Sequence, residues 1–208
     1  MKKFLTPQEE FWAGNFGDEY ADRNKGVQWI ANNIALFSKI FVHTRGVKSV
    51  IEFGANIGLN LKAIRHLMPH AELSAIEIND KAVTELQQWG GLKNIYPISI
   101  LDFEPAGQND FAFIKGVLIH INPDMLPQVY GKLYGASKKY ICIAEYYNPT
   151  PVTVPYRGHE DRLFKRDFAG EMLDKYPDLA LIDYGFSYHR DPNYPQGDIT
   201  WFLLKKAG

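Results

Sequence analysis

The sequence predicts one α/β domain with a doubly wound, mostly parallel sheet of seven strands, the last of them antiparallel. Three observations support this prediction. Between residues 48 and 176, short β-branched runs alternate with amphipathic segments, as is typical of a parallel sheet covered by helices on both faces. A glycine turn follows the first run, at residues 54–58. The last two runs have no helical segment between them and should therefore pair as an antiparallel hairpin.

The expected elements follow one another with short connections. Residues 6–9 (Thr-Pro-Gln-Glu) have the pattern of a capping box, with proline at the first helical position. From residue 27, apolar side chains recur at helical spacing and stop before Gly46. We expect strands over residues 48–53, 72–78, 95–99, 111–118, 140–147, 179–189 and 198–205. We expect further helices over residues 57–68, 80–89, 123–135 and 166–176, and a long polar and aromatic loop from 147 to 164.

We interpret the chain as a single domain of residues 1–208, with an N-terminal helical cap (1–46) and a sheet-containing core (47–208). Lysine and arginine number 23 against 24 acidic residues, so no broad electrostatic attraction to nucleic acid or to an anionic membrane is expected. No apolar run is long enough to cross a bilayer, and residues 1–10 turn acidic too soon for a signal peptide. Cys142, the only cysteine, lies in an apolar run and is expected to be buried and inert. These features predict a cytoplasmic protein.

The most informative segment is residues 49–60, where an apolar strand contains Glu52 and two glycines, Gly54 and Gly58, frame a turn that opens a helix. Glycine lets the backbone approach a ligand closely, and a helix N-terminus favours negatively charged groups. The spacing E-x-G-x-x-x-G differs from the G-x-G-x-x-G of dinucleotide-binding proteins. This difference weighs against a nicotinamide-dependent reductase, which stays the less favoured alternative.

Further polar groups follow the next strands, and the carboxyl ends of parallel strands share one edge of the sheet. Glu77 comes about 25 residues after Glu52, where an acid commonly accepts hydrogen bonds from ribose hydroxyls. Asp102 lies between apolar residues that could flank an adenine ring, and Gly116 ends the fourth strand. Taken singly, Glu77 fits a solvated strand end and Asp102 fits a turn cap. Their joint placement predicts a site for a nucleotide-like ligand.

From about Lys48 to Lys205 the chain resembles class I S-adenosylmethionine-dependent methyltransferases. The glycine turn is similar to their first motif, with Ala55-Asn56 where Cys-Gly is commoner, and the antiparallel last strand is also typical of them. The resemblance implies S-adenosylmethionine as the cofactor. The residues it implies for cofactor binding are Tyr20, Arg23, Glu52, Gly54, Ala55, Asn56, Gly58, Glu77, Ile78, Asn79, Leu101, Asp102, Phe103, Lys115 and Gly116.

A narrower resemblance rests on residues 11–24, 145–149 and 155–161, which together are similar to methylases associated with pseudaminic acid biosynthesis. It implies that the acceptor is a hydroxyl or amine of a bacterial sugar or sugar nucleotide. The N-terminal aromatic residues Trp12, Phe16 and Tyr20 are interpreted as core contacts of a packed helix. The resemblance adds a second interpretation, a lid over the cofactor that holds Tyr20 and Arg23 near its methionine carboxylate.

Methyl transfer is an in-line displacement at an activated sulfonium carbon, so it requires neither a metal nor a covalent enzyme intermediate. No cluster with metal-ligand spacing is found in the sequence. A general base is needed only when the acceptor must lose a proton. His120 is the leading candidate because it follows the fourth strand, and the alternative is a histidine that only fixes the loop. Glu145 and His159 are further catalytic candidates, with an internal ion pair as the alternative for Glu145.

The loop after the fifth strand is expected to bind the acceptor through Tyr146, Tyr156 and Arg157. Arginine beside aromatic residues suits an anionic acceptor such as a sugar acid or a phosphate-bearing sugar. The alternative is a surface loop whose charges pair with Glu160 and Asp161. The leading hypothesis is therefore a small-molecule methyltransferase without nucleic-acid or membrane partners. A non-catalytic S-adenosylmethionine-binding regulator or partner subunit in a glycan pathway is the alternative.

Overall fold

The computed structural model describes residues 4–207, so residues 1–3 of the expected cap and residue 208 of the expected core lie outside it. Seven strands form one sheet in the order β3-β2-β1-β4-β5-β9-β8. They are β1 (Ser49–Phe53), β2 (Glu72–Ile76), β3 (Asn94–Tyr96), β4 (Asn109–Lys115), β5 (Ser137–Glu145), β8 (Leu179–Ser187) and β9 (Ile199–Lys206). The first five run parallel, and β9 lies antiparallel between β5 and β8. The predicted sheet with its reversed last strand is confirmed.

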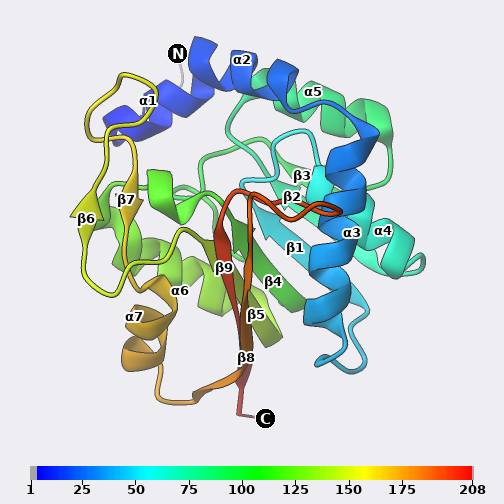
Figure 1. Ribbon diagram of the computed structural model, residues 1–208. Coiled ribbons are helices and arrows are strands. Elements are labelled where there is room, and N and C mark those ends of the chain that lie inside the picture. Colours follow the sequence, from blue (N-terminus) through cyan, green and yellow to red (C-terminus); the bar gives the residue numbers. More distant parts are fainter. Residues whose placement is uncertain (1–3, 208) are drawn as a thin grey trace.

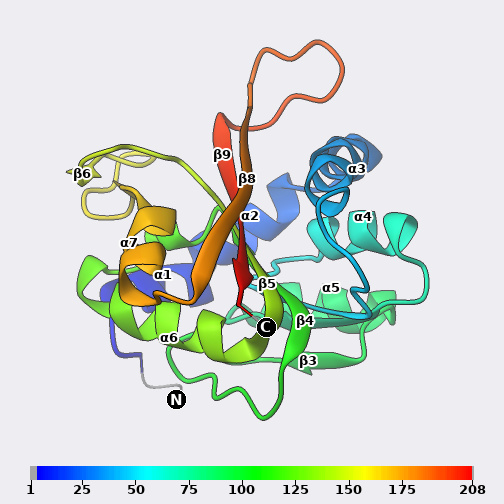
Figure 2. The same ribbon diagram turned by 90° about the horizontal axis from the view of Figure 1, so that it is seen from below.

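Helices cover both faces of the sheet and the side formed by the carboxyl ends of its parallel strands (Figures 1 and 2). One face carries α3 (Val27–Phe41), α4 (Leu59–Leu67) and α5 (Asp80–Trp89), and the other carries α6 (Leu126–Ala136) and α7 (Phe168–Lys175). The first two helices, α1 (Pro7–Ala13) and α2 (Asn15–Arg23), lie across the carboxyl ends of the strands. Most of α3 packs against the sheet, whereas α1, α2 and the first turns of α3 reach this edge.

Side chains cap the N-termini of α1 and α5. Thr6 Oγ1 accepts a hydrogen bond from the Glu9 amide, and Glu9 Oε2 accepts one from the Thr6 amide at 2.8 Å. This reciprocal pair is the predicted capping box at the start of α1. Asn79 Oδ1 accepts from the Ala82 amide at 2.9 Å and caps α5 in the same way.

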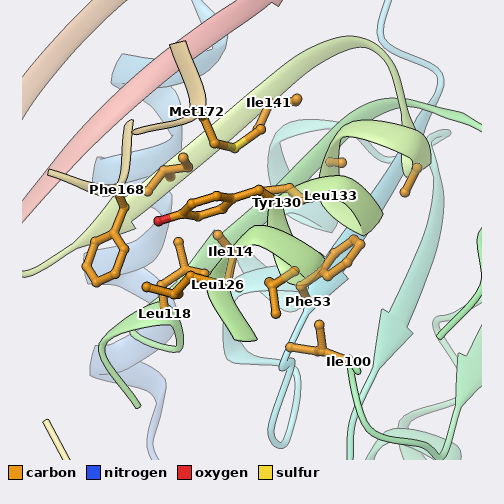
Figure 3. Close-up of a cluster of buried hydrophobic side chains, with 14 of the residues drawn as sticks. Phe53, Ile100, Ile114, Leu118, Leu126, Tyr130, Leu133, Ile141, Phe168 and Met172 are labelled. Carbon is orange, nitrogen blue, oxygen red and sulfur yellow. The ribbon is translucent and has the colours of Figure 1, made fainter. Parts of the chain in front are cut away.

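Two hydrophobic clusters, one on each face, hold the layers together. In the cluster under α6 and α7, Figure 3 shows the ring of Tyr130 between Met172 and Leu126. The Tyr130 hydroxyl leaves this apolar surrounding to donate a hydrogen bond to Glu171 at 2.7 Å. Burial on both faces explains why the central strands are almost continuously apolar.

The structure differs from the predicted elements at a strand end and within the long predicted loop. The predicted strand 111–118 stops at Lys115, because Gly116 adopts a left-handed φ of 66° and the chain turns into a short 3₁₀ helix, η1 (Leu118–His120). A second 3₁₀ turn, η2 (Pro123–Met125), precedes α6. The predicted loop 147–164 contains a small ribbon of β6 (Val152–Thr153) and β7 (Phe164–Lys165).

Within residues 4–207, no helix combines the length and the apolar character needed to cross a membrane.

Candidate functional site

A cavity lies at the carboxyl edge of the sheet, beneath α1 and α2. Its walls come from the N-terminal helices and from the turns that follow β1, β2, β3 and β4. The residues that line it are Thr6, Gln8, Glu9, Trp12, Gly17, Tyr20, Asn24, Trp29, Asn33, Gly54, Ala55, Asn56, Ile57, Leu59, Asn60, Ile76, Glu77, Ile78, Asn79, Ser99, Ile100, Leu101, Lys115, Gly116, Val117, His120, Ile121 and Asn122. The structure therefore brings most of the predicted cofactor-binding residues to one place.

The turn after β1 is held in a shape that needs its glycines. Gly54 and Gly58 have left-handed φ values of 76° and 77°. A Cβ atom on Gly54 would lie 2.7 Å from Val117 Cγ2, and one on Gly58 would lie 2.7 Å from Leu86 Cδ2. Close packing thus requires both glycines, in addition to any approach of a ligand. Gly54 lines the cavity, whereas Gly58 does not.

Glu52 lies beneath this turn and outside the cavity wall, and its predicted contact with the cofactor stays a prediction. It is fully buried, and its Oε1 accepts a hydrogen bond from Asn60 Nδ2 at 2.6 Å. Burial raises the pKa of Glu52 to about 8. Because Asn60 itself lines the cavity, Glu52 acts on the site by orienting the Asn60 amide.

Glu77 connects the turns that follow β1 and β2. Its Oε2 accepts a hydrogen bond from the Asn56 amide at 2.6 Å, and its Oε1 accepts one from the Asn79 amide at 2.8 Å. Glu77 and Ile78 line the cavity, as predicted for a ribose-binding segment. Asn79 also lines it, but its side chain caps α5 and donates to Asp18 Oδ1 of α2 at 2.8 Å.

The turn after β3 differs from its predicted arrangement. Leu101 lines the cavity together with Ser99 and Ile100, whereas Asp102 and Phe103 do not. The amides of Asp102 and Phe103 both donate to the Ser99 carbonyl, and this tight turn leaves Asp102 exposed to solvent. Phe103 is buried against Phe53, with ring centroids 5.6 Å apart. The predicted contact of Asp102 with an adenine amino group stays a prediction.

Glu145 supports the turn after β4 from below. Its Oε1 accepts hydrogen bonds from the amides of Val117 and Leu118, both at 2.9 Å, and the side chain is buried outside the cavity wall. Burial raises the pKa of Glu145 to about 7, against the opposing effect of the backbone amides. The Glu145 carboxylate thus holds the turn that carries His120, and its predicted catalytic role stays a prediction.

His120 lies in the cavity wall with only 6% of its surface exposed. Its Nδ1 is 2.5 Å from the carbonyl oxygen of Arg162. Since a carbonyl oxygen only accepts, Nδ1 carries the proton and Nε2 keeps a free lone pair. Burial lowers the pKa of His120 to about 4, so the imidazole is neutral at physiological pH. The rings of Trp12 and Tyr156 flank it at centroid distances of 4.7 and 4.8 Å.

The residues predicted to bind the acceptor lie beside the cavity and not in its wall. Tyr156 contacts His120 and Phe16, which connects the loop to α2. Arg157 is exposed, with its guanidinium 5.8 Å from the Tyr156 ring. Tyr146 is half-buried under the ammonium group of Lys165 at 5.3 Å.

His159 is exposed, and its ring packs against the Phe11 ring of α1 at 4.9 Å, away from the cavity wall. Its predicted catalytic role stays a prediction. The alternative expectation for this loop was a set of internal charge pairs. Within residues 4–207, neither Glu160 nor Asp161 forms an ion pair with Arg157.

The N-terminal helices contribute a different set of residues from the one predicted. Tyr20 lines the cavity, and burial raises the pKa of its hydroxyl to about 12, which keeps it protonated. Arg23 lies outside the wall, paired with Glu19 on the surface at 3.2 Å, and its predicted contact with the cofactor stays a prediction. Wall residues that sequence reasoning did not identify include Gln8, Glu9, Asn24, Trp29, Asn33, Asn60 and Ser99.

Contacts from α1 to two other segments close the cavity from above. The Ser99 hydroxyl donates to Glu9, and Gln8 Nε2 donates to the carbonyl oxygen of Asp161 at 3.1 Å. No local sequence pattern indicated these contacts, since each joins positions 90 or more residues apart. Among residues 4–207 there is no group of three or more side chains placed to hold a metal ion.

Replacing His120 with asparagine tests whether folding buries the His120 imidazole in its neutral form. The pKa of His120 falls from 6.5 to about 4 on folding, so this group stabilises the fold fully above pH 6.5 and loses that effect as the pH falls through 4. Between pH 7 and pH 4, urea denaturation should show wild-type protein losing about 3 kcal/mol more stability than His120→Asn. Glu52 and Glu145 titrate in both proteins and cancel in the comparison. Parallel pH profiles would contradict the prediction.

No protein-family model matches the sequence, and no curated protein matches it. Solved structures match over nearly the whole chain. The 1,6-didemethyltoxoflavin-N1-methyltransferase of Burkholderia thailandensis, bound to 1,6-didemethyltoxoflavin and S-adenosylhomocysteine, has a TM-score of 0.69 at 14% identity, covering 100% of this chain and 94% of that chain. The magnesium protoporphyrin IX methyltransferase of Synechocystis PCC 6803, with bound S-adenosylmethionine, has a TM-score of 0.67 at 12% identity and covers 100% of both chains.

A third structure, the plantazolicin methyltransferase BpumL in complex with S-adenosylhomocysteine, has a TM-score of 0.68 at 13% identity, covering 97% of this chain and 94% of that chain. These identities are low, and the likeness concerns the order and direction of the strands and the helices around them. The chain therefore has the Rossmann-like fold of class I S-adenosylmethionine-dependent methyltransferases.

Proposed function

We propose that this protein is an S-adenosylmethionine-dependent methyltransferase that acts on a small molecule. The observation that carries the proposal is one cavity wall shared by the glycine turn, Glu77, Leu101 and His120. In an open α/β sheet, ligands bind at this carboxyl edge. The fold shared with methyltransferases that hold S-adenosylmethionine or its demethylated product supports the same assignment.

The residues present fit this cofactor. Glu77 lines the cavity, and a carboxylate, which accepts several hydrogen bonds, suits a pair of ribose hydroxyls. Ile78, Ile100 and Leu101 supply apolar surface for an adenine ring, and the backbone around Gly54 and Gly116 leaves room for close approach. When bound, S-adenosylmethionine supplies an activated methyl group.

His120 is proposed as the base that takes a proton from the acceptor. Its Nε2 lone pair is available because Nδ1 donates to the Arg162 carbonyl oxygen. Its low pKa keeps the imidazole unprotonated, and an anionic acceptor beside it would raise that pKa again by stabilising the imidazolium. Helices α1 and α2 are proposed to act as a lid that keeps water from the reacting atoms, and bonds such as that between Asp18 and Asn79 hold it in place.

The acceptor is proposed to be an anionic sugar or sugar nucleotide of a pseudaminic acid-type pathway. Arg157 and Lys165 support an anionic acceptor, because each lies over a tyrosine ring beside the cavity and neither forms an ion pair within residues 4–207. The hydroxyls of Tyr146 and Tyr156 add hydrogen-bonding groups suited to a polyhydroxylated molecule. The sequence resemblance to methylases of that pathway supports the sugar class.

Calorimetric titration with S-adenosylmethionine tests the cofactor site. Folded wild-type protein should bind it saturably, and Glu77→Gln should weaken binding by about 10- to 100-fold, because a charge-assisted hydrogen bond is lost. Asp102→Asn is the matched control: it removes a neighbouring carboxylate that lies outside the cavity, and it should bind like wild type. If folded wild-type protein binds neither S-adenosylmethionine nor S-adenosylhomocysteine, the proposed function is wrong.

His120→Asn also separates a catalytic from a loop-fixing role. The asparagine amide can still donate to the Arg162 carbonyl oxygen, as Nδ1 does, but it lacks the Nε2 lone pair. With an identified acceptor, kcat should fall by about 10²- to 10⁴-fold while the Kd for S-adenosylmethionine stays unchanged. His159→Asn, the control off the cavity wall, should keep kcat within a few-fold of wild type. Unchanged turnover by His120→Asn would assign His120 to loop support alone.

A further inference from the structure

We infer that the outer strand β8 forms the contact surface of a symmetric dimer of this chain. The β8 surface is defined by Leu181, Ile182, Tyr184, Phe186 and Tyr188. Twelve large apolar side chains are exposed among residues 4–207, and five of them lie in this eight-residue stretch, with 40–64% of each exposed. Contiguous apolar patches of this kind mark interaction surfaces in soluble proteins.

A bulge in β8 sets the direction of these side chains, so that Leu181 and Tyr184 share one face of the sheet, while Phe186 and Tyr188 also line a cavity beside α3. Leu181 lies opposite Leu204 of β9 and Tyr184 lies opposite Phe202, although three positions separate them in β8 and two in β9. Tyr184 stacks on Phe202, which Tyr147 also contacts. The face is the one that α6 and α7 cover nearer the middle of the sheet. Figure 2 shows the β8–β9 hairpin extending beyond the helices, between α7 and α3.

The edge of β8 contains no lysine or proline, although a bulge and Asp183 interrupt its apolar run. β8 pairs only with β9 in the described sheet, so its outer backbone groups face away from the sheet. Edge strands of monomers usually carry lysine, proline or inward-pointing charges. Asp183 is the only charged residue of β8, and His43 Nε2 holds its carboxylate at 2.9 Å on the opposite face.

A second copy of this chain matches both the exposed apolar side chains and the unpaired outer backbone of β8. An antiparallel β8 related by a two-fold axis offers the same apolar side chains and complementary backbone donors and acceptors. At about 200 Å² per large side chain, the exposed fractions amount to roughly 500 Å² per copy. Full burial of these side chains in a symmetric pair would cover roughly 1,000 Å², which is the lower limit for a specific interface. The absence of lysine and arginine from residues 179–187 argues against an anionic membrane as the occupant.

Sedimentation velocity of the full chain tests the inference. Wild-type protein at micromolar concentration should sediment at twice the monomer mass, and Tyr184→Lys combined with Phe186→Lys should sediment as a monomer with unchanged far-ultraviolet circular dichroism. Val27→Lys is the matched control, because Val27 is more exposed than any residue of the β8 surface but lies on α3, and it should stay dimeric. Dimeric β8 variants would place the interface elsewhere and overturn the inference.

Hydrogen exchange on wild-type protein provides a test that needs no substitution. Amides of residues 181–188 should exchange more slowly at high protein concentration than at high dilution, while amides of α3 should not change. A wild-type protein that is monomeric at all concentrations, or that shows no concentration-dependent protection of this stretch, would overturn the inference. The result would hold whether or not the protein binds S-adenosylmethionine, because the β8 surface and the cavity are separate.

Discussion

The two hydrogen bonds that Glu77 accepts from the backbone are the constraint on which the candidate site depends. They join the amide of Asn56, in the turn after β1, to that of Asn79, at the start of α5. The same carboxylate lies in the cavity wall. One side chain thus sets the distance between two turns and presents oxygens to a ligand. Charge-assisted bonds of this type are stronger than neutral ones, so the two turns are held rigidly before any ligand arrives.

A second buried carboxylate has the equivalent task on the other side of the cavity. Glu145 accepts the amides of Val117 and Leu118 and so fixes the turn that leads into His120. The two halves of the site are therefore anchored from below, and the Nδ1 contact of His120 with the β6–β7 segment fixes the imidazole from the side. In the proposed methyl transfer, such positioning of the reacting groups supplies much of the acceleration.

The parts of this arrangement that depend on local pattern were predictable from the sequence. The alternation of runs predicted the sheet, and the glycine turn and Glu77 were found because each follows a strand directly. Side-chain direction in a tight turn was not predictable, which is why Asp102 was expected in the cavity and is exposed instead. The N-terminal wall residues, such as Gln8 and Asn33, come from helices whose place over the sheet depends on long-range contacts that leave no local signal.

Transfer of an isotopically labelled methyl group from S-adenosylmethionine to a small molecule is the most direct test of the proposed methyltransferase activity. The acceptors are a panel of sugar acids and nucleotide sugars, including pseudaminic acid derivatives, and the low-molecular-mass fraction of a cell extract. We expect a labelled small molecule that gains the mass of one methyl substitution, with release of S-adenosylhomocysteine in equal amount. Saturable cofactor binding without labelling of any small molecule would contradict this expectation and would favour a non-catalytic binding protein.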